Sequence, residues 1–359
     1  MNDREESRQY LHLPLRIFFT SLVCFCFQTA LGEVRGRDMV RSHLAANSQT
    51  IDVVKVHRQR SFRKTVPAGN YSGITSLGAD RYAVVDDKAP DDGFAIFRID
   101  IDTVSGKILD VVHEGYRSSG TSGRDMEAVA FFPPAGTVFV SGERDNSIME
   151  YALDGRHTGR ILSLPSDFAS ATQAYGLESL TYNAVTHRFW TTTESTLRQD
   201  GPQASATNGV RNRLRLQSFD DSLMPAEQYF YEMDKPEAHA EARHYAMGVS
   251  ELCALDDGRL IVLEREFFVP KRLIGAWVRC KLFVVNPQSV QPGTTLDKVE
   301  LVKFKTRLNL FNYGLANYEG LCVGPRLSDG SVVLIMVSDS QNRYRGVLKD
   351  RFRSIVIRP

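Results

Sequence analysis

From residue 70 onward, short apolar runs recur at the spacing of β-strands. The stretch Met126–Phe132 is a clear example, because the turn Pro133–Gly136 follows it and a second apolar run then ends at Glu143. Short apolar runs separated by Gly- or Pro-rich turns indicate antiparallel strands joined by hairpins. No run of helical periodicity alternates with these strands, so the pattern excludes a parallel α/β sheet.

The same unit occurs five times along the chain. Each copy has a short apolar strand, a turn and a second apolar strand that ends in Asp or Glu, and two more strands follow in most copies. A repeat of this length predicts the blades of a β-propeller. We therefore expect an all-β fold, a single β-propeller of five four-stranded blades. Six blades are the alternative, if the long third or fourth interval contains a divergent one. The copies begin at Asn70, Met126, Leu177, Ser250 and Tyr318.

The ends of the repeat region suggest how the ring closes. The fifth copy offers only Ser354–Ile357 after its first two strands, while Ile51–Val56 alternates like a strand before the first copy. We expect this N-terminal strand to close the last blade, since closure removes an exposed sheet edge. One segment departs from the β pattern: Pro236–Met247 is rich in Ala and Glu and predicts a helix over one face of the propeller.

The N-terminus has the features of a secretory signal. Arginines precede the apolar run Ile17–Phe27, and the small residues Ala30 and Gly32 stand before Glu33. The run is too short to span a bilayer, so we predict a signal peptide over residues 1–32 and an exported, periplasmic or secreted protein without a stable membrane span. The acidic residues near Met1 leave an uncleaved anchor or a cytosolic start as alternatives. Residues 33–66 would form an N-terminal segment that includes the closing strand, and residues 67–359 the propeller domain.

Composition narrows the function classes. The 44 basic and 43 acidic residues leave a net charge of +1, and no basic tract with aromatic residues appears, so we expect no nucleic-acid binding. The sequence has no GxSxG elbow, P-loop or HExxH motif. The cysteines outside the signal have no CxxC spacing, so we expect them to be buried. A disulfide between two of them, Cys253 and Cys280, is an alternative, and Cys322 is the third.

Acidic residues recur at equivalent places in the copies. Because innermost propeller strands line the central channel, such positions form rings around it. A first ring has a gap at Ser72, and a second ring follows at the ends of the second strands. The expected members are Glu127, Glu178, Glu251 and Glu319 in the first ring, and Asp86 or Asp87, Glu143, Glu194, Glu264 and Asp339 in the second.

Crowded carboxylates repel one another and need compensation. A divalent cation such as Ca²⁺, which takes six to eight oxygen ligands, would supply it, and the first-ring acids Glu127, Glu178, Glu251 and Glu319 are its expected ligands. The second-ring acids Glu143, Glu194, Glu264 and Asp339 are the expected catalytic groups. Arg124, Arg144 and Arg265 are expected to bind an anionic substrate. Alternatively, the acids only accept hydrogen bonds from backbone NH groups of the adjacent blade.

Several motifs, taken in order, resemble the phytase-like ("esterase-like activity of phytase") domain family. They are Arg124–Val129, Gly176–Leu180, Leu263–Phe267, Asn317–Leu321 and Val337–Asn342. The resemblance covers roughly residues 67–357 and implies an exported bacterial propeller with phosphoester or carboxylester hydrolysis. It assigns no catalytic residue, and Ser72 departs from the acidic pattern, which weakens a symmetrical metal cage.

Two functions follow. The first is a metal-assisted hydrolase of a small phosphorylated or ester substrate, with no organic cofactor, acting as a monomer; its metal would lower the pKa of a bound water. The second is a non-catalytic propeller that binds a ligand or an envelope protein partner. An open pocket with an arginine within reach of phosphate would favour the first, and an acid ring buried under blade contacts would favour the second.

Overall fold

The computed structural model describes residues 50–171, 175–309 and 313–359. Residues 51–359 form one compact unit. The predicted signal peptide lies outside the described residues. Within the described part of the chain, no helix is long and apolar enough to cross a membrane.

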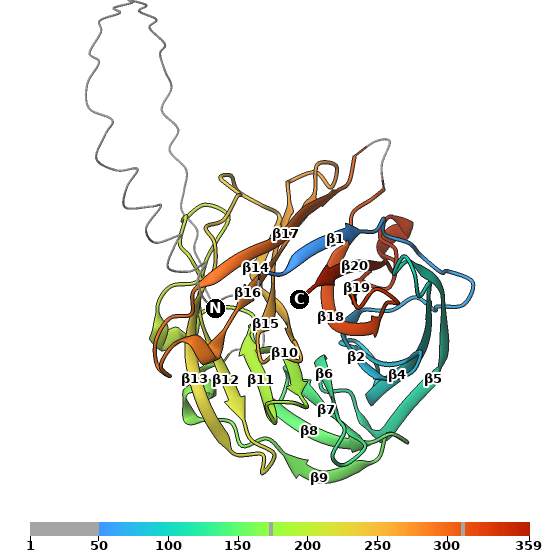
Figure 1. The fold of residues 1–359 in the computed structure, drawn as a ribbon. Helices are drawn as coiled ribbons and strands as arrows, with labels where there is room; N and C mark the ends of the chain where they lie inside the picture. The colour runs from blue at the N-terminus through green and yellow to red at the C-terminus, as the bar shows by residue number, and fades with distance from the viewer. Residues whose placement is uncertain (1–49, 172–174, 310–312) are drawn as a thin grey trace, which may run out of the picture. The chain divides into compact units, whose positions relative to one another are not determined.

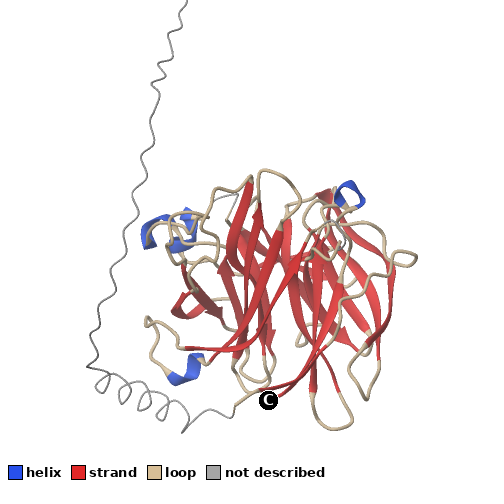
Figure 2. Cartoon of the chain, turned by 90° about the horizontal axis from the view of Figure 1, so that it is seen from above, coloured by secondary structure: helices blue, strands red, loops and turns tan. Residues whose placement is uncertain are grey.

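The described residues form five four-stranded antiparallel sheets that follow one another along the chain (Figure 1). Short 3-10 segments lie in the connections (Figure 2): Ser166–Ser170, Arg198–Asp200, Pro287–Ser289 and Tyr344–Gly346. Blade one contains β2 (Tyr71–Gly78), β3 (Arg81–Asp86), β4 (Asp91–Ile101) and β5 (Ile108–Ser122). Blade two contains β6 (Met126–Phe132), β7 (Thr137–Gly142), β8 (Ser147–Ala152) and β9 (His157–Ile161). Blade three contains β10 (Leu177–Asn183), β11 (Arg188–Thr193), β12 (Arg213–Phe219) and β13 (Pro225–Glu232). Blade four contains β14 (His244–Ala254), β15 (Leu260–Val269), β16 (Trp277–Val285) and β17 (Lys298–Arg307). Blade five contains β18 (Asn317–Arg326), β19 (Val332–Asp339), β20 (Phe352–Arg358) and β1 (Asp52–Val56).

The innermost strands close a ring. Strand β2 contacts β6, β6 contacts β10, β10 contacts β14, β14 contacts β18, and β18 returns to β2. Strand β1 pairs antiparallel with β20, with Val56 opposite Ile355. The five-blade propeller and its closure by the N-terminal strand are therefore confirmed.

The two faces of each sheet pack against the two neighbouring blades, and apolar side chains alternate between these faces along a strand. In β15, Leu260 and Val262 pack with Leu216 of blade three, whereas Ile261 and Leu263 belong to the core shared with blade five. Successive side chains on a strand point to opposite faces. A register shift of one residue in β15 would therefore turn each of these side chains toward the opposite neighbouring blade.

The helix predicted over 236–247 is wrong. Residues 233–243 cross without helical structure from blade three to blade four, and β14 already begins at His244. The backbone NH groups of Glu237 and Ala238 donate to the Glu266 carboxylate at 2.9 Å, and Arg243 N donates to Val269 O. Contacts with blade four thus satisfy backbone donors of this segment and override its local propensity.

Most of the long connections lie at one end of the propeller, where the inner strands begin and the second strands end. We call this end the channel mouth; its connections include 194–212, 233–243, 308–316 and 340–351. Tight turns such as 79–80, 133–136 and 184–187 connect strands at the other end. Long loops on a rigid scaffold commonly carry binding and catalytic residues. Cys253, Cys280 and Cys322 are free and buried.

Candidate functional site at the channel mouth

Every inner strand carries a β-bulge, which lies near the strand's start in four blades and midway along β14 in blade four. The register with the neighbouring strand shifts after Tyr71, Met126, Leu177, Val249 and Tyr318. Bulges leave a residue outside the regular pairing and re-aim its side chain. The first bulged residues are Ser72, Glu127, Glu178, Ser250 and Glu319.

Blade four therefore differs from the expected alignment by one residue. Gly248 pairs with Arg265 and Val249 with Glu264, while in blade three Leu177 pairs with Thr193. Arg265 thus takes the second-ring position that Glu194 holds in blade three. The expectation that Glu264 belongs to the second ring is wrong.

The first ring needs the same correction. The hydroxyl of Ser72 donates to Met126 O at 2.7 Å, and that of Ser250 to Tyr318 O at 3.4 Å. Both carbonyls belong to the residue before the bulge of the next blade, so the two serines are equivalent. Ser250, and not Glu251, is the blade-four member of the first ring.

Glu251 instead holds two blades together. Its Oε1 accepts hydrogen bonds from Leu180 N in blade three and from Leu252 N, both at 3.1 Å. The side chain is fully buried, and burial raises its pKa well above the usual range. This is the structural role that the sequence left open for the acids.

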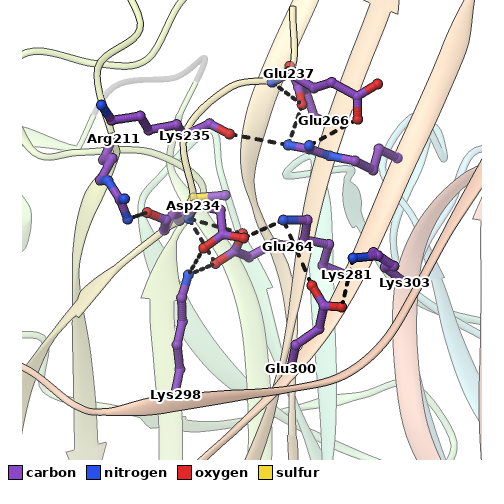
Figure 3. Close-up of polar contacts among 12 residues, drawn as sticks. Arg211, Asp234, Lys235, Glu237, Glu264, Glu266, Lys281, Lys298, Glu300 and Lys303 are labelled. Carbon is purple, nitrogen blue, oxygen red and sulfur yellow. Dashed lines mark hydrogen bonds and ion pairs between the residues drawn. The ribbon is translucent and has the colours of Figure 1, made fainter. Parts of the chain in front are cut away.

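Glu264 faces blade three rather than the channel (Figure 3). It accepts hydrogen bonds from the Tyr231 hydroxyl at 2.7 Å and from Lys298 Nζ at 2.6 Å. Burial raises its pKa although Lys298 acts in the opposite direction. Glu266, two residues on, lies on the same face and pairs with Arg279 at 2.6 Å. The same two carboxylates accept hydrogen bonds from Asp234 N at 3.3 Å and Glu237 N at 2.9 Å, which hold the 233–243 crossing against blade four.

The corrected positions bring a set of acids together, which we call the acid ring. Two cations compensate it. Arg265 is 6% exposed and pairs with Glu194 and Glu319, and its Nη1 donates to Asn317 Oδ1 at 3.1 Å. Lys88 Nζ lies 2.9 Å from Asp87 Oδ2. The acid ring consists of Asp87, Glu127, Glu143, Glu178, Glu194, Glu319 and Asp339.

Burial and mutual repulsion make members of this ring weak acids. Burial, opposed by a hydrogen bond from Gly176 N and aided by the charge of Glu194, raises the pKa of Glu143 to about 7. Burial and the charge of Asp87 raise the pKa of Asp339 to about 7. The pKa values of Glu127, Glu178 and Glu319 are raised well above normal, chiefly by burial. Of these acids, Glu143 and Asp339 can exchange protons near neutral pH.

The other two predicted arginines lie away from the ring. Arg124 is buried against outer strands, where it binds Asp145 Oδ1 at 2.9 Å and the Tyr151 hydroxyl at 2.9 Å. Arg144 is exposed and pairs with Asp125 at 3.2 Å. Neither guanidinium contacts a ring acid in the described structure. Of the three predicted arginines, only Arg265 contacts acids of the ring in the described structure. The sequence analysis did not single out the second cation, Lys88, although it directly follows Asp87.

The acid ring does not fit the expected calcium cage. Among the described residues, no group of three or more His, Cys, Asp and Glu side chains is arranged to hold a metal ion. The guanidinium of Arg265 stands between Glu194 and Glu319, where a cation would be needed. The four acids expected to bind calcium are therefore not arranged as a calcium site in the described structure.

Access to the ring is limited. Glu127, Glu178 and Glu194 are at most 9% exposed, whereas Glu143 is half-buried and Lys88 exposed. A cavity of about 360 Å³ lies beside the residues that follow β3; Asp86, Lys88 and Asn342 are among its lining residues, and none of the ring acids is. Another, of about 230 Å³, lies near Tyr175 and Leu197. Lys88, which pairs with the ring acid Asp87, thus connects the ring to the larger cavity.

Comparison with known proteins identifies one family. The profile of the phytase-like family, described as esterase-like activity of phytase, matches residues 66–341. No curated protein sequence matches the chain. An endo-arabinase from Bacteroides thetaiotaomicron is 12% identical, with 83% of this chain and 97% of that chain covered and a TM-score of 0.44. A streptogramin B lyase is 12% identical, with 84% and 98% covered and a TM-score of 0.37. Similarities this weak carry no functional information.

Proposed function

Because the chain belongs to the phytase-like family with esterase-like activity of phytase, we propose that it hydrolyses phosphoester or carboxylester bonds at the channel mouth. The observation that carries this proposal is that the exposed cation Lys88 lies beside the ring acid Asp87, in a ring that contains carboxyls with raised pKa values. Lys88 Nζ lies 2.9 Å from Asp87 and 3.7 Å from Asp125. A cation beside proton-exchanging carboxyls is a suitable arrangement for polarising an ester and moving protons.

Glu143 and Asp339 are the proposed proton-transfer groups. With pKa values of about 7, each is partly protonated at neutral pH. One carboxylate accepts the proton of the attacking water, and a protonated carboxyl donates to the departing oxygen. The ammonium of Lys88 stabilises negative charge that develops on the substrate oxygen.

The proposed site of action is outside the cytosol, as a periplasmic or secreted monomer. This rests on the apolar run Ile17–Phe27 and the cleavage pattern before Glu33. The three cysteines among the described residues are free and buried, and burial would protect their thiols from oxidation outside the cytosol.

The test is a panel of carboxylic and phosphate esters assayed with the purified chain. Glu143→Gln and Asp339→Asn should each lower turnover at least about 100-fold, the usual contribution of a general acid or base. Arg144→Gln, at an exposed pair outside the ring, is the matched control and should keep normal turnover. Equal activity in all three variants would refute the proposal.

The burial of the ring favours a second candidate, the non-catalytic propeller. Glu194 is 4% exposed and Arg265 6%, and Arg265 is already paired, so it offers no free guanidinium to phosphate. Such a protein would bind a ligand or an envelope protein partner at the same mouth. No hydrolysis of any ester, together with a rise in melting temperature on ligand addition, would establish this candidate instead.

A further inference from the structure

A strained loop runs from the ring acid Asp339 to the wall of the cavity of about 360 Å³, which Asn342 lines. Gln341, Asn342 and Arg343 follow one another with φ of 47°, 52° and 56°, a left-handed conformation that non-glycine residues rarely adopt. Each such residue costs about 1–3 kcal/mol, and this kind of strain gathers at functional sites.

Specific contacts hold this loop in place. Gln341 N donates to the ring acid Asp339 at 2.5 Å, and Asn342 N donates to Gly69 O at 3.3 Å. Arg343 is bound by Asp350 at 2.6 Å. The loop thus connects Asp339 directly to Asn342, which lines the cavity.

The cavity walls are mostly apolar or neutral. Tyr71, Tyr116 and several Ala and Pro residues line it, and no arginine is among the described residues that do so. His113 also lines it, and burial and the charge of Arg117 lower its pKa, which favours the uncharged imidazole. Lys88 is the cavity's one lining cation in the described chain, and Asp87 and Asp125 already compensate it.

Electrostatics therefore disfavour a phosphate monoester here. A dianionic phosphate would lie beside the acid ring, where like charges at short range repel, and no unpaired guanidinium is available to grip it. A neutral ester meets no such repulsion. A volume of about 360 Å³ lies at the lower end of the range for small-molecule sites and accommodates a single aromatic ring with its ester.

We infer that this cavity binds the apolar or aromatic acyl group of a neutral carboxylic ester, and that carboxylic rather than phosphate esters are the substrates. The inference rests on the proposed hydrolytic function. In the reaction, the water oxygen bonds to the ester carbonyl carbon while a ring carboxylate takes its proton. The carbon–oxygen bond to the alcohol then breaks, and a protonated ring carboxyl donates a proton to the departing oxygen.

The experiment compares 4-nitrophenyl acetate, benzoate and phosphate, which share one leaving group. The purified chain should hydrolyse both carboxylic esters and leave the phosphate at background. Ala68→Trp, at an exposed position on the cavity wall, should raise KM for the benzoate at least about tenfold with little change for the acetate. Ala135→Trp, exposed in a turn at the other end, is the matched control, and Ala89→Phe is a second cavity variant should the first fold poorly.

The outcomes separate the two proposals. Hydrolysis of the phosphate alone overturns the substrate class but leaves the hydrolytic function standing. Equal KM values for benzoate in the wild type and in both folded cavity variants overturn the cavity assignment only. No hydrolysis of any of the three esters overturns the proposed function and this inference together.

Discussion

Arg265 is the residue whose removal tests the corrected register most directly. It is 6% exposed and compensates Glu194 and Glu319. Arg265→Gln removes the charge but keeps a side chain that can still donate to Asn317. Breaking a buried ion pair by removing one partner typically costs about 3–5 kcal/mol, because a buried charge is left alone. We expect a loss of that size in the free energy of unfolding at pH 8.

The loss should shrink at low pH. The pKa of Glu319 is already raised in the folded protein, so its protonated form stabilises the fold at low pH, and that stability is lost as the pH rises. Removing Arg265 raises this pKa further. The deficit of the variant should therefore be much smaller at pH 5 than at pH 8.

Urea unfolding at the two pH values measures both quantities. Arg144→Gln serves as control, because its partner Asp125 is at the surface and such pairs contribute less than about 1 kcal/mol. Adding Glu319→Gln to Arg265→Gln removes one uncompensated acid and should restore part of the stability at pH 8. A loss below about 1 kcal/mol at pH 8, or the same loss at both pH values, would show that Arg265 is not the ring's cation.

Four further expectations follow from the same structure. The pKa of Glu143, raised to about 7, makes its ionised form unfavourable above that pH, so Glu143→Gln should raise stability at pH 8 and not at pH 4. At about 1.36 kcal/mol per pKa unit, the gain in the free energy of unfolding is at most about 3.4 kcal/mol, and the partial exposure of Glu143 reduces it to roughly 1–2 kcal/mol. A loss of stability at pH 8 would contradict this. Gly248→Ala would place its Cβ 2.3 Å from Glu194 Cγ and should lower stability by about 1–3 kcal/mol in urea unfolding, so an unchanged midpoint would argue against this packing. Chelation with EDTA should leave the melting temperature unchanged; a fall that Ca²⁺ reverses would establish the calcium site. Mass spectrometry of the exported protein should find an N-terminus near Glu33, and an intact Met1 form in the soluble cytosol would refute export.

The fold could be inferred from the repeat because its determinants are local. Strand length, the alternation of apolar residues and the turn Pro133–Gly136 depend on neighbours in the chain. Counting the copies was then enough to predict five blades and the closure by Ile51–Val56, which pairs with β20. Most ring members, among them Glu127, Glu143 and Asp339, were found in the same way.

Blade four shows where this reasoning stops. Its motif Ser250–Glu251 aligns by residue type with Leu177–Glu178, but the bulge lies at Ser250. Since side chains alternate across a strand, this single step turns Glu264 toward blade three and Arg265 into the channel. Hydrogen bonding between strands decides the position of a bulge, and residue type alone does not reveal it.

The segment 236–247 illustrates the same limit for secondary structure. Its Ala and Glu residues favour a helix only weakly, by fractions of a kcal/mol per residue. The Glu266 carboxylate instead accepts hydrogen bonds from Glu237 N and Ala238 N. The compensation of the ring by Arg265 and the cavity beside Lys88 likewise arise only when distant blades meet, because charge and volume at the channel depend on residues far apart in the sequence.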